Sequence, residues 1–250
     1  MEEHDVLSGA FAMPRLSPSY PIGPYRFVSR EYLTIAYRSD PDTLRRLLPE
    51  PLELRLPEVR FQFIRMPDST GFGEYAMAAQ IIPATLPNGE AGGYVHAVYV
   101  NSHTANTGGR ELWGFPQKLA RPSLTVERDT LCGALDFGPV PVARGSMGFK
   151  HRAVPEAEAM AELAAPGVLL KIIPHVDGRP RICELVRYQM GELRFKGCWT
   201  APAALQLMPH ALAPVAELPV LEVLRATHLI ADCTLQLGEV IHDYLSEGVA

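Results

Sequence analysis

Lysine is scarce in this sequence, and the chain has no excess of positive charge. Only four lysines (Lys118, Lys150, Lys171 and Lys196) stand against nineteen arginines in 250 residues, and the formal net charge is −5. Nucleic-acid binding requires a basic surface, so this charge balance argues against a nucleic-acid partner. With so few lysines, one that lies in an apolar stretch is a candidate for chemistry rather than for surface solvation.

Cysteine is also sparse, and long apolar runs are absent. Cys132, Cys183, Cys198 and Cys233 form no CxxC pair, which predicts free thiols in a reducing cytoplasm rather than disulfides or a zinc site. No stretch approaches the roughly 18 apolar residues of a membrane span. The first residues, MEEHDVLSGAFAMP, are acidic and lack the apolar core of a signal peptide. We therefore expect a cytoplasmic protein with no membrane partner and no metal ion.

The sequence does contain many short segments in which apolar and polar residues alternate, separated by some of its 23 prolines and 20 glycines. Such segments are typical of half-buried strands, and the lack of a regular strand–helix alternation argues against a parallel sheet. We predict one domain over residues 1–250, with an α+β, mainly β fold. It combines an antiparallel barrel-like sheet, short peripheral helices and an irregular arm over residues 1–25.

The predicted elements follow from this alternation and from cap and turn residues. The expected strands cover residues 26–37, 58–66, 74–82, 94–100, 124–129, 130–137, 140–149, 167–174, 181–186, 193–200 and 229–237. The expected helices cover residues 40–48, 155–163, 219–226 and 239–245.

The stretch GRELWGFPQKLA, residues 109–120, is the candidate for the reactive centre. It sets Lys118 between Pro116 and Leu119, in an apolar and aromatic setting. A partly desolvated amine has a lowered pKa, and the neutral amine can attack a carbonyl to form a Schiff base. The alternative interpretation is a lysine whose stem packs while its ammonium reaches water.

Read with its surroundings, this stretch resembles acetoacetate decarboxylase. The resemblance extends over nearly the whole chain, through SPSYPIGPYRF, LLPEPLEL, MPDSTGFGEY, GRELWGFPQKLA, MGFKHRA, LLKIIPHVDGRPRICEL, ALQLMPHALAPVAELPV and HLIADCTL. That family removes CO2 from acetoacetate without metal or cofactor, through a lysine Schiff base that is a known example of an activated amine. The resemblance also implies a cone-shaped, largely antiparallel barrel and a homo-oligomer.

The resemblance fails at three positions of the implied active site. The family's central block reads Pro-Lys-Lys-Leu, and its first lysine forms the Schiff base; here that position is Gln117, and Lys118 matches the second lysine. Two active-site glutamates of the family are replaced by Gln62 and Met77, whereas an active-site arginine is retained as Arg30. An amide cannot form an imine, Gln62 keeps hydrogen bonding without charge, and Met77 adds an adaptable apolar wall.

The neighbouring side chains at positions 117 and 118 point in opposite directions if the segment is extended. We therefore expect Gln117 to face the cavity and Lys118 to face away. A turn begun by Pro116 would break that alternation and allow Lys118 to take over as the reacting amine, so both arrangements remain open from sequence.

The three replacements together favour an enzyme with redirected chemistry, of the lyase class. The favoured reading is aldol condensation with dehydration, cyclisation or hydration on a small keto acid or polyketide-like substrate, without a cofactor. Arg30 would anchor an anionic oxygen, and Gln62 and Gln117 would donate hydrogen bonds. The wall would consist of Tyr75, Met77, Trp113 and Phe115. The alternatives are decarboxylation of acetoacetate or another β-keto acid through Lys118, and a binding protein without activity.

Overall fold

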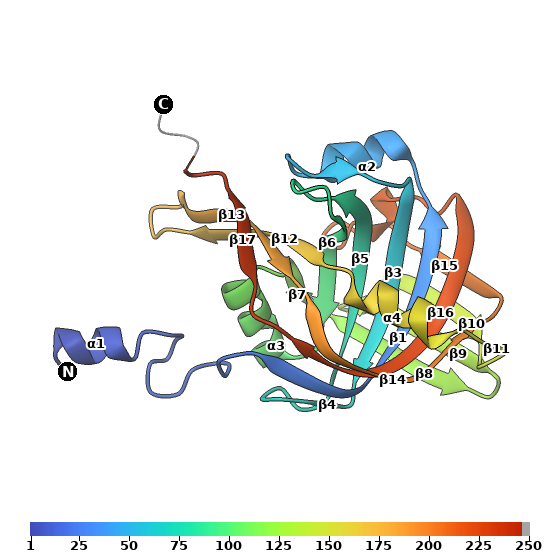
Figure 1. Cartoon of the computed structure of the whole chain (residues 1–250), viewed down its shortest axis with the longest axis horizontal. Coiled ribbons are helices and arrows are strands. Elements are labelled where there is room, and N and C mark those ends of the chain that lie inside the picture. Colours follow the sequence, from blue (N-terminus) through green and yellow to red (C-terminus); the bar gives the residue numbers. More distant parts are fainter. Residues whose placement is uncertain (247–250) are drawn as a thin grey trace.

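The computed structural model describes residues 1–246, and strands dominate it (Figure 1). The strands are β1 (Tyr25–Arg38), β2 (Glu53–Leu54), β3 (Glu58–Met66), β4 (Asp68–Ser69), β5 (Tyr75–Thr85), β6 (Ala91–Val100), β7 (Gln117–Leu119), β8 (Arg121–Glu127), β9 (Thr130–Phe137), β10 (Val140–Gly148), β11 (Arg152–Ala153), β12 (Gly167–Pro174), β13 (Pro180–Tyr188), β14 (Met190–Thr200), β15 (Ala203–Leu207), β16 (Glu222–Leu235) and β17 (Glu239–Asp243). The helical elements are α1 (Glu3–Ser8), α2 (Pro41–Leu47), α3 (His103–Gly108), the π-helical turn η1 (Gly109–Trp113), α4 (Glu156–Ala164) and the 3-10 turn η2 (Val215–Glu217).

In the described part of the chain, the strands form two sheets. The main path of a 13-stranded sheet runs β11-β14-β16-β1-β3-β5-β6-β12-β13-β17, with β2, β4 and β7 paired to β5, β1 and β6. A four-stranded sheet has the order β15-β10-β9-β8. Neighbouring strands are antiparallel except that β6 runs parallel to both β7 and β12.

The prediction of a mainly β, α+β fold with short peripheral helices is confirmed. The predicted barrel-like sheet does not close into a barrel, because within the described residues the end strands β11 and β17 pair with β14 and β13 and not with each other. Closure requires end strands that can pair along their length, and β11 has only two residues. The large sheet is therefore open.

The predicted helices at residues 40–48 and 155–163 correspond to α2 and α4. At the start of α2, the carboxylate of Asp40 accepts a hydrogen bond of 2.8 Å from the backbone N–H of Thr43, and Pro41 occupies the first turn. The N-terminal arm contains the short α1, which projects from the body of the molecule (Figure 1). Among the described residues, no helix combines the length and the apolar character needed to cross a bilayer.

Two other predicted helices are wrong. Residues 222–226 begin β16, which pairs with β1 on one side and β14 on the other. Residues 239–243 form β17 against the edge of β13. In both segments, pairing with strands distant in sequence overrides the helical spacing of the leucines and valines.

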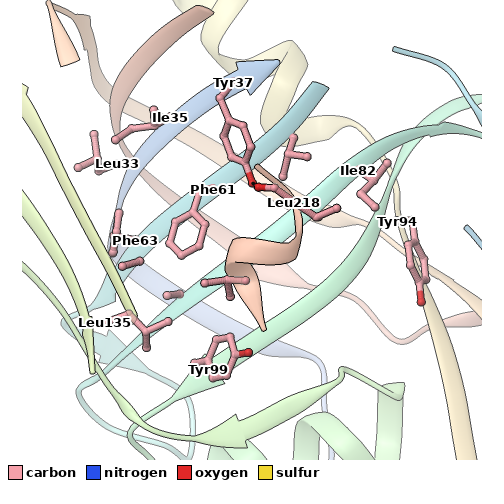
Figure 2. Packing of buried hydrophobic residues seen from close by; sticks show 14 of the residues in the cluster. Leu33, Ile35, Tyr37, Phe61, Phe63, Ile82, Tyr94, Tyr99, Leu135 and Leu218 are labelled. Carbon is pink, nitrogen blue, oxygen red and sulfur yellow. Dashed lines mark hydrogen bonds between the residues drawn. The ribbon is translucent and has the colours of Figure 1, made fainter. Parts of the chain in front are cut away.

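A first apolar core fills the space between the two sheets. It buries Leu33 and Ile35 of β1 and Phe61 and Phe63 of β3 against side chains of the small sheet such as Leu135. Figure 2 shows these side chains converging on one side of the large sheet. Burying each such side chain contributes about 1.5–3 kcal/mol, so this face anchors the strands that carry the site.

A second apolar cluster covers the opposite face of the large sheet. Because side chains alternate along a strand, the strands that fill the first core also present Tyr32, Ile64, Tyr75 and Met77 to this second face. Trp113, from η1, packs in the same cluster. The candidate site lies within this cluster.

Candidate active site

A pocket opens within the second cluster. Seven of the eight residues predicted from sequence line it, and Lys118 does not. The seven are Arg30, Gln62, Tyr75, Met77, Trp113, Phe115 and Gln117. A neighbouring pocket is bordered by α4 and shares Arg30 and Gln62 with the first. The fold therefore brings these seven side chains together around one pocket.

Among the described residues, Arg30 is the single charged residue of the pocket lining. It is only 6% exposed, and its Nε has no hydrogen-bond partner in the described residues. Its terminal nitrogens contact the sulfur atoms of Met77 at 3.8 Å and Met190 at 3.9 Å. The guanidinium carbon lies 4.7 Å from the ring centre of Phe27 and 4.9 Å from that of Tyr32. Aromatic faces offset part of the desolvation of this cation, but no carboxylate in the described part of the chain neutralises it.

Gln62 reaches the pocket because β3 alternates. Phe61 and Phe63 point into the first core, and Gln62 points to the opposite face. The Nε2 of Gln62 donates a hydrogen bond of 3.2 Å to Oγ1 of Thr34 on the paired strand β1. One amide proton is therefore engaged within the protein, and the amide carries no charge at any physiological pH.

Tyrosines surround the guanidinium. Burial raises the pKa of both Tyr75 and Tyr188 to about 12, although the charge of Arg30 acts to lower it. Both hydroxyls therefore keep their protons near neutral pH. No hydrogen bond joins either hydroxyl to another group in residues 1–246, and both side chains line the pocket.

The helical segment that precedes β7 was not predicted from sequence. Ser102 caps α3 by accepting a hydrogen bond of 3.2 Å from the backbone N–H of Ala105. The helix then widens into the π-helical turn η1 and ends at Gly114, whose φ is +93°. A Cβ at Gly114 would come within 2.8 Å of the Lys171 Cα, so the residue must be glycine for conformation and for space. Single π turns frequently occur at functional sites.

This turn sets two aromatic walls of the pocket. Nε1 of Trp113 donates a hydrogen bond of 2.9 Å to the carbonyl of Gln236, which fixes the indole. The Phe115 ring packs against Tyr188 with 4.9 Å between ring centres. These contacts join residues 109–120 to Gln236 and Tyr188, which lie much later in the sequence.

Gln117 and Lys118 point in opposite directions, as the alternation of an extended strand predicts. Gln117 is 7% exposed and lines the pocket, and its amide nitrogen, in the orientation that satisfies its neighbours, donates to the carbonyls of Ala105 at 2.8 Å and Asn106 at 3.3 Å. Lys118 is exposed, and its Nζ donates a hydrogen bond of 2.8 Å to the carbonyl of Leu212. Recruitment of Lys118 as an amine inside this pocket is therefore not supported.

The other lysines also have partners elsewhere. Lys171 donates to the carbonyl of Leu112 at 3.0 Å, and burial lowers its pKa. Lys150 lies over the ring of Trp199 at 4.4 Å, and Lys196 pairs with an aspartate of β16. Within the described part of the chain, the pocket lining contains neither a lysine nor a carboxylate. The described lining therefore offers no amine to form an imine and no carboxylate to act as an acid or a base.

Twelve residues of the described lining were missed from sequence, and four of them are large side chains of β1, β13 and β14. These four are Tyr25, Phe27, Tyr188 and Met190. Tyr25 and Phe27 precede a shift in the register of β1, between Phe27 and Arg30, which side-chain alternation alone cannot reveal. The other two join the site through pairing of strands far from the central block, and no local pattern marks them.

Comparison with known proteins identifies the class and then the family. The relatives that this chain matches are lyases, so the class is an enzyme of the lyase type. The family model for acetoacetate decarboxylase (ADC) matches residues 12–245, and the chain belongs to that family. It is 60% identical over 247 residues to the acetoacetate decarboxylase of Paraburkholderia xenovorans, covering 99% of this chain and 98% of the relative.

Two further similarities agree with this assignment. Acetoacetate decarboxylase 1 of Mesorhizobium japonicum is 60% identical over 247 residues, covering 99% of this chain and all of the relative (100%). The crystal structure of acetoacetate decarboxylase from Legionella pneumophila superposes with a TM-score of 0.91 at 45% identity, covering 96% of each chain. The expected family is thereby confirmed.

The predicted change to aldol-dehydration, cyclisation or hydration is wrong in the light of these relatives. Proteins that share about 60% of their residues with nearly the whole chain are named acetoacetate decarboxylases. Three replaced side chains in one pocket are a small difference beside that similarity. Decarboxylation is the reaction that the comparisons favour.

Proposed function

We propose that this protein removes CO2 from acetoacetate or another small β-keto acid, and that Arg30 rather than a lysine imine stabilises the developing charge. The observation that carries the proposal is a guanidinium buried in the pocket, with no carboxylate partner among residues 1–246. An uncompensated buried cation favours the binding of a small anion. The names of the relatives point to a β-keto carboxylate as that anion.

The proposed bond changes are those of an enolate mechanism. The bond between the α-carbon and the carboxylate breaks, and CO2 leaves. Its electron pair forms a double bond to the carbonyl carbon, while the carbonyl electron pair moves onto the ketone oxygen. Arg30 holds the resulting enolate oxygen, because a preorganised charge in a dry site stabilises a developing anion more strongly than water does.

A proton must then reach the α-carbon to form the ketone. Tyr75 and Tyr188 are protonated, line the pocket and have raised pKa values. Either hydroxyl can donate its proton and recover one from water, so the net reaction consumes one solvent proton. The charge of Arg30 stabilises the transient phenolate. Proton transfer from a positioned group contributes about 10²–10⁴-fold to a rate.

The remaining lining shapes the pocket in this proposal. Gln62 and Gln117 have amide nitrogens engaged by protein acceptors, so they hold the walls in place rather than donate both protons to a ligand. Met77, Trp113 and Phe115 exclude water, which strengthens the electrostatic effect of Arg30.

The test is the rate of CO2 release from acetoacetate, measured above the spontaneous rate. Arg30→Met should lower that rate by about 10²–10³-fold, as removal of one oxyanion donor does in other enzymes. Lys118→Met is the matched control and should leave the rate unchanged, because its ammonium lies outside the pocket. A rate that survives in Arg30→Met and disappears in Lys118→Met contradicts the proposal.

A second candidate is a binding protein without activity. The observation that favours it is the lack of any lysine or carboxylate in the described pocket lining. Calorimetric titration with butanoate, an unreactive carboxylate, separates the two. Binding that depends on Arg30, together with CO2 release no faster than the spontaneous rate, supports the binding protein and overturns the decarboxylase.

We also propose that the protein is a cytoplasmic homo-oligomer. Its four cysteines are unpaired, as expected in a reducing compartment. The N-terminal arm exposes Met13 and Leu16 at 76% and 85%, which supports burial against a second copy. Light scattering should give a multiple of the chain mass of 27.5 kDa. A monomer mass at micromolar concentration would argue against this assembly.

A further inference from the structure

The direction of Arg30 depends on a bulge in β1. Phe27 pairs with Cys233 and Arg30 with Ala231, so β1 has one residue more than β16 between these two pairs. One extra residue reverses the face to which the following side chains point. Tyr25 and Phe27 line the pocket before the bulge, and Arg30 lines it after. Without the extra residue, Arg30 would point toward the opposite face of the sheet.

Ser29 occupies the centre of this bulge and has an unusual backbone conformation. Its φ of +54° lies in the left-handed region, which glycine occupies far more readily. Such a conformation persists only when the surroundings hold it. Three contacts do so here: the backbone N–H of Ser29 donates to Oδ1 of Asp232 at 2.7 Å, Nζ of Lys196 pairs with the same carboxylate at 2.5 Å, and Nζ also donates to Oγ of Ser29 at 2.8 Å.

These contacts join three adjacent strands. Ser29 lies on β1, Asp232 on β16 and Lys196 on β14. Lys196 is itself an extra residue, since Phe195 and Gly197 pair with consecutive residues of β16. The carboxylate of Asp232 therefore connects two bulges on either side of its own strand.

The ion pair is partly shielded from water, with side-chain exposures of 37% for Lys196 and 23% for Asp232. Burial acts to raise the pKa of Asp232, but the hydrogen bonds from Lys196 and from the Ser29 backbone hold it below its ordinary value. The acceptor for the Ser29 N–H is therefore ionised at neutral pH. Charge-assisted hydrogen bonds of this kind are stronger than neutral ones.

We infer that Asp232 and Lys196 are positioning residues, which fix the bulge at Ser29 and so direct Arg30 into the pocket. Neither residue lines either of the two pockets, so they act through Arg30 and not on the ligand. The inference rests on the proposed function only in taking Arg30 as the group that binds the substrate anion.

The experiment compares binding of a charged and a neutral probe of similar size, butanoate and 2-pentanone. Asp232→Ala should weaken butanoate binding by at least about tenfold, the effect of one hydrogen bond to a charged group, and leave 2-pentanone binding unchanged. Asp232→Asn keeps an oxygen for the Ser29 N–H and should retain most of the butanoate affinity. Glu222→Ala is the matched control, because it removes an exposed ion pair with Arg38 between the same two strands.

A crystal structure of Asp232→Ala gives the second readout and needs no ligand. The bulge should rearrange and the Arg30 guanidinium should leave the pocket. An unchanged bulge with Arg30 still in the pocket overturns the inference, as does an equal loss of both probes. If Asp232→Ala does not fold, binding of butanoate and 2-pentanone is compared in Lys196→Met instead, with the same expected result. Failure of the wild type to release CO2 from acetoacetate would overturn the proposed decarboxylase without affecting this structural readout.

Discussion

Arg30 lies among aromatic rings and thioethers, and within the described residues no carboxylate neutralises it. A buried cation without a partner lowers the stability of the fold, because desolvation is not offset. Its presence is understandable if the charge is needed for a ligand. Stability and function then oppose each other at this one residue.

Arg30→Met should therefore stabilise the protein while it removes anion binding. Apolar replacements of buried charges are often stabilising by about 1–4 kcal/mol, and methionine fits the thioether surroundings of this site. Urea unfolding measures the free energy, and butanoate titration measures the binding. A variant that loses stability and still binds butanoate would contradict the role assigned to Arg30.

The pH dependence should be flat near neutrality. Tyr75 and Tyr188 have pKa values raised by burial to about 12, and Arg30 keeps its charge, so no group of the described lining titrates between about pH 5 and pH 9. The rate should fall only as the pH rises toward 12 and the tyrosines lose the proton they donate. A bell-shaped profile of kcat/KM centred near neutral pH would instead indicate a titrating amine or acid.

The positions of Gln117, Lys118 and Gln62 were predictable because alternation along an extended strand depends only on local geometry. The same argument could not find Tyr188, since its place in the pocket depends on the pairing of β13 with β12 and of β12 with β6. It also could not find the bulge at Ser29. That bulge rests on a carboxylate more than 200 residues away in sequence.

At the scale of elements, the segment from α3 through η1 to β7 determines how residues 109–120 enter the pocket. Gly114 ends η1 with a left-handed backbone, close to the backbone of Lys171. The pocket residue Gln117 follows three positions later. The geometry of this short turn therefore sets the direction in which the chain runs from Gly114 to Gln117.

Gly114→Ala should be much more destabilising than Gly138→Ala. Both glycines have positive φ (+93° and +60°), so an alanine at either position should lower the free energy of unfolding by about 1–2 kcal/mol through its backbone conformation. A Cβ at Gly138 meets nothing within 4 Å, whereas one at Gly114 would lie 2.8 Å from the Lys171 Cα. Urea unfolding of the two variants gives the comparison. Equal losses would show that the contact with Lys171 does not constrain the turn.

The elements that sequence misassigned share one property. The beginning of β16 and the whole of β17 have leucine and valine spacing that is compatible with a helix, and both are strands because distant partners pair with them. The helix α2 was predictable because its cap residues, Asp40 and Pro41, act locally. Local signals were therefore sufficient for caps and alternation, but not for strands defined by pairing.

At the scale of the molecule, the large sheet joins distant parts of the chain. β1 near the N-terminus pairs with β16 near the C-terminus, and the pocket takes residues from both halves. We therefore expect one cooperative unfolding transition, with equal calorimetric and van't Hoff enthalpies. Two separate transitions in differential scanning calorimetry would contradict the single domain predicted from sequence.

The fold and most of the sequence are shared with acetoacetate decarboxylases, while the pocket lining in the described residues has an amide at position 117 and one unpaired guanidinium. The central claim is that catalysis in this pocket proceeds without a covalent bond to a lysine. Intact-mass analysis after treatment with acetoacetate and borohydride tests it most directly, because borohydride reduces an imine to a stable adduct.

Gln117→Lys provides the positive control, since it introduces an amine into the apolar pocket, where desolvation and the charge of Arg30 should lower its pKa. We expect an adduct in Gln117→Lys, and none in the wild type, which should continue to release CO2 after the treatment. A wild-type protein that gains the mass of the reduced adduct on any of its lysines, and loses CO2 release with it, would contradict the account.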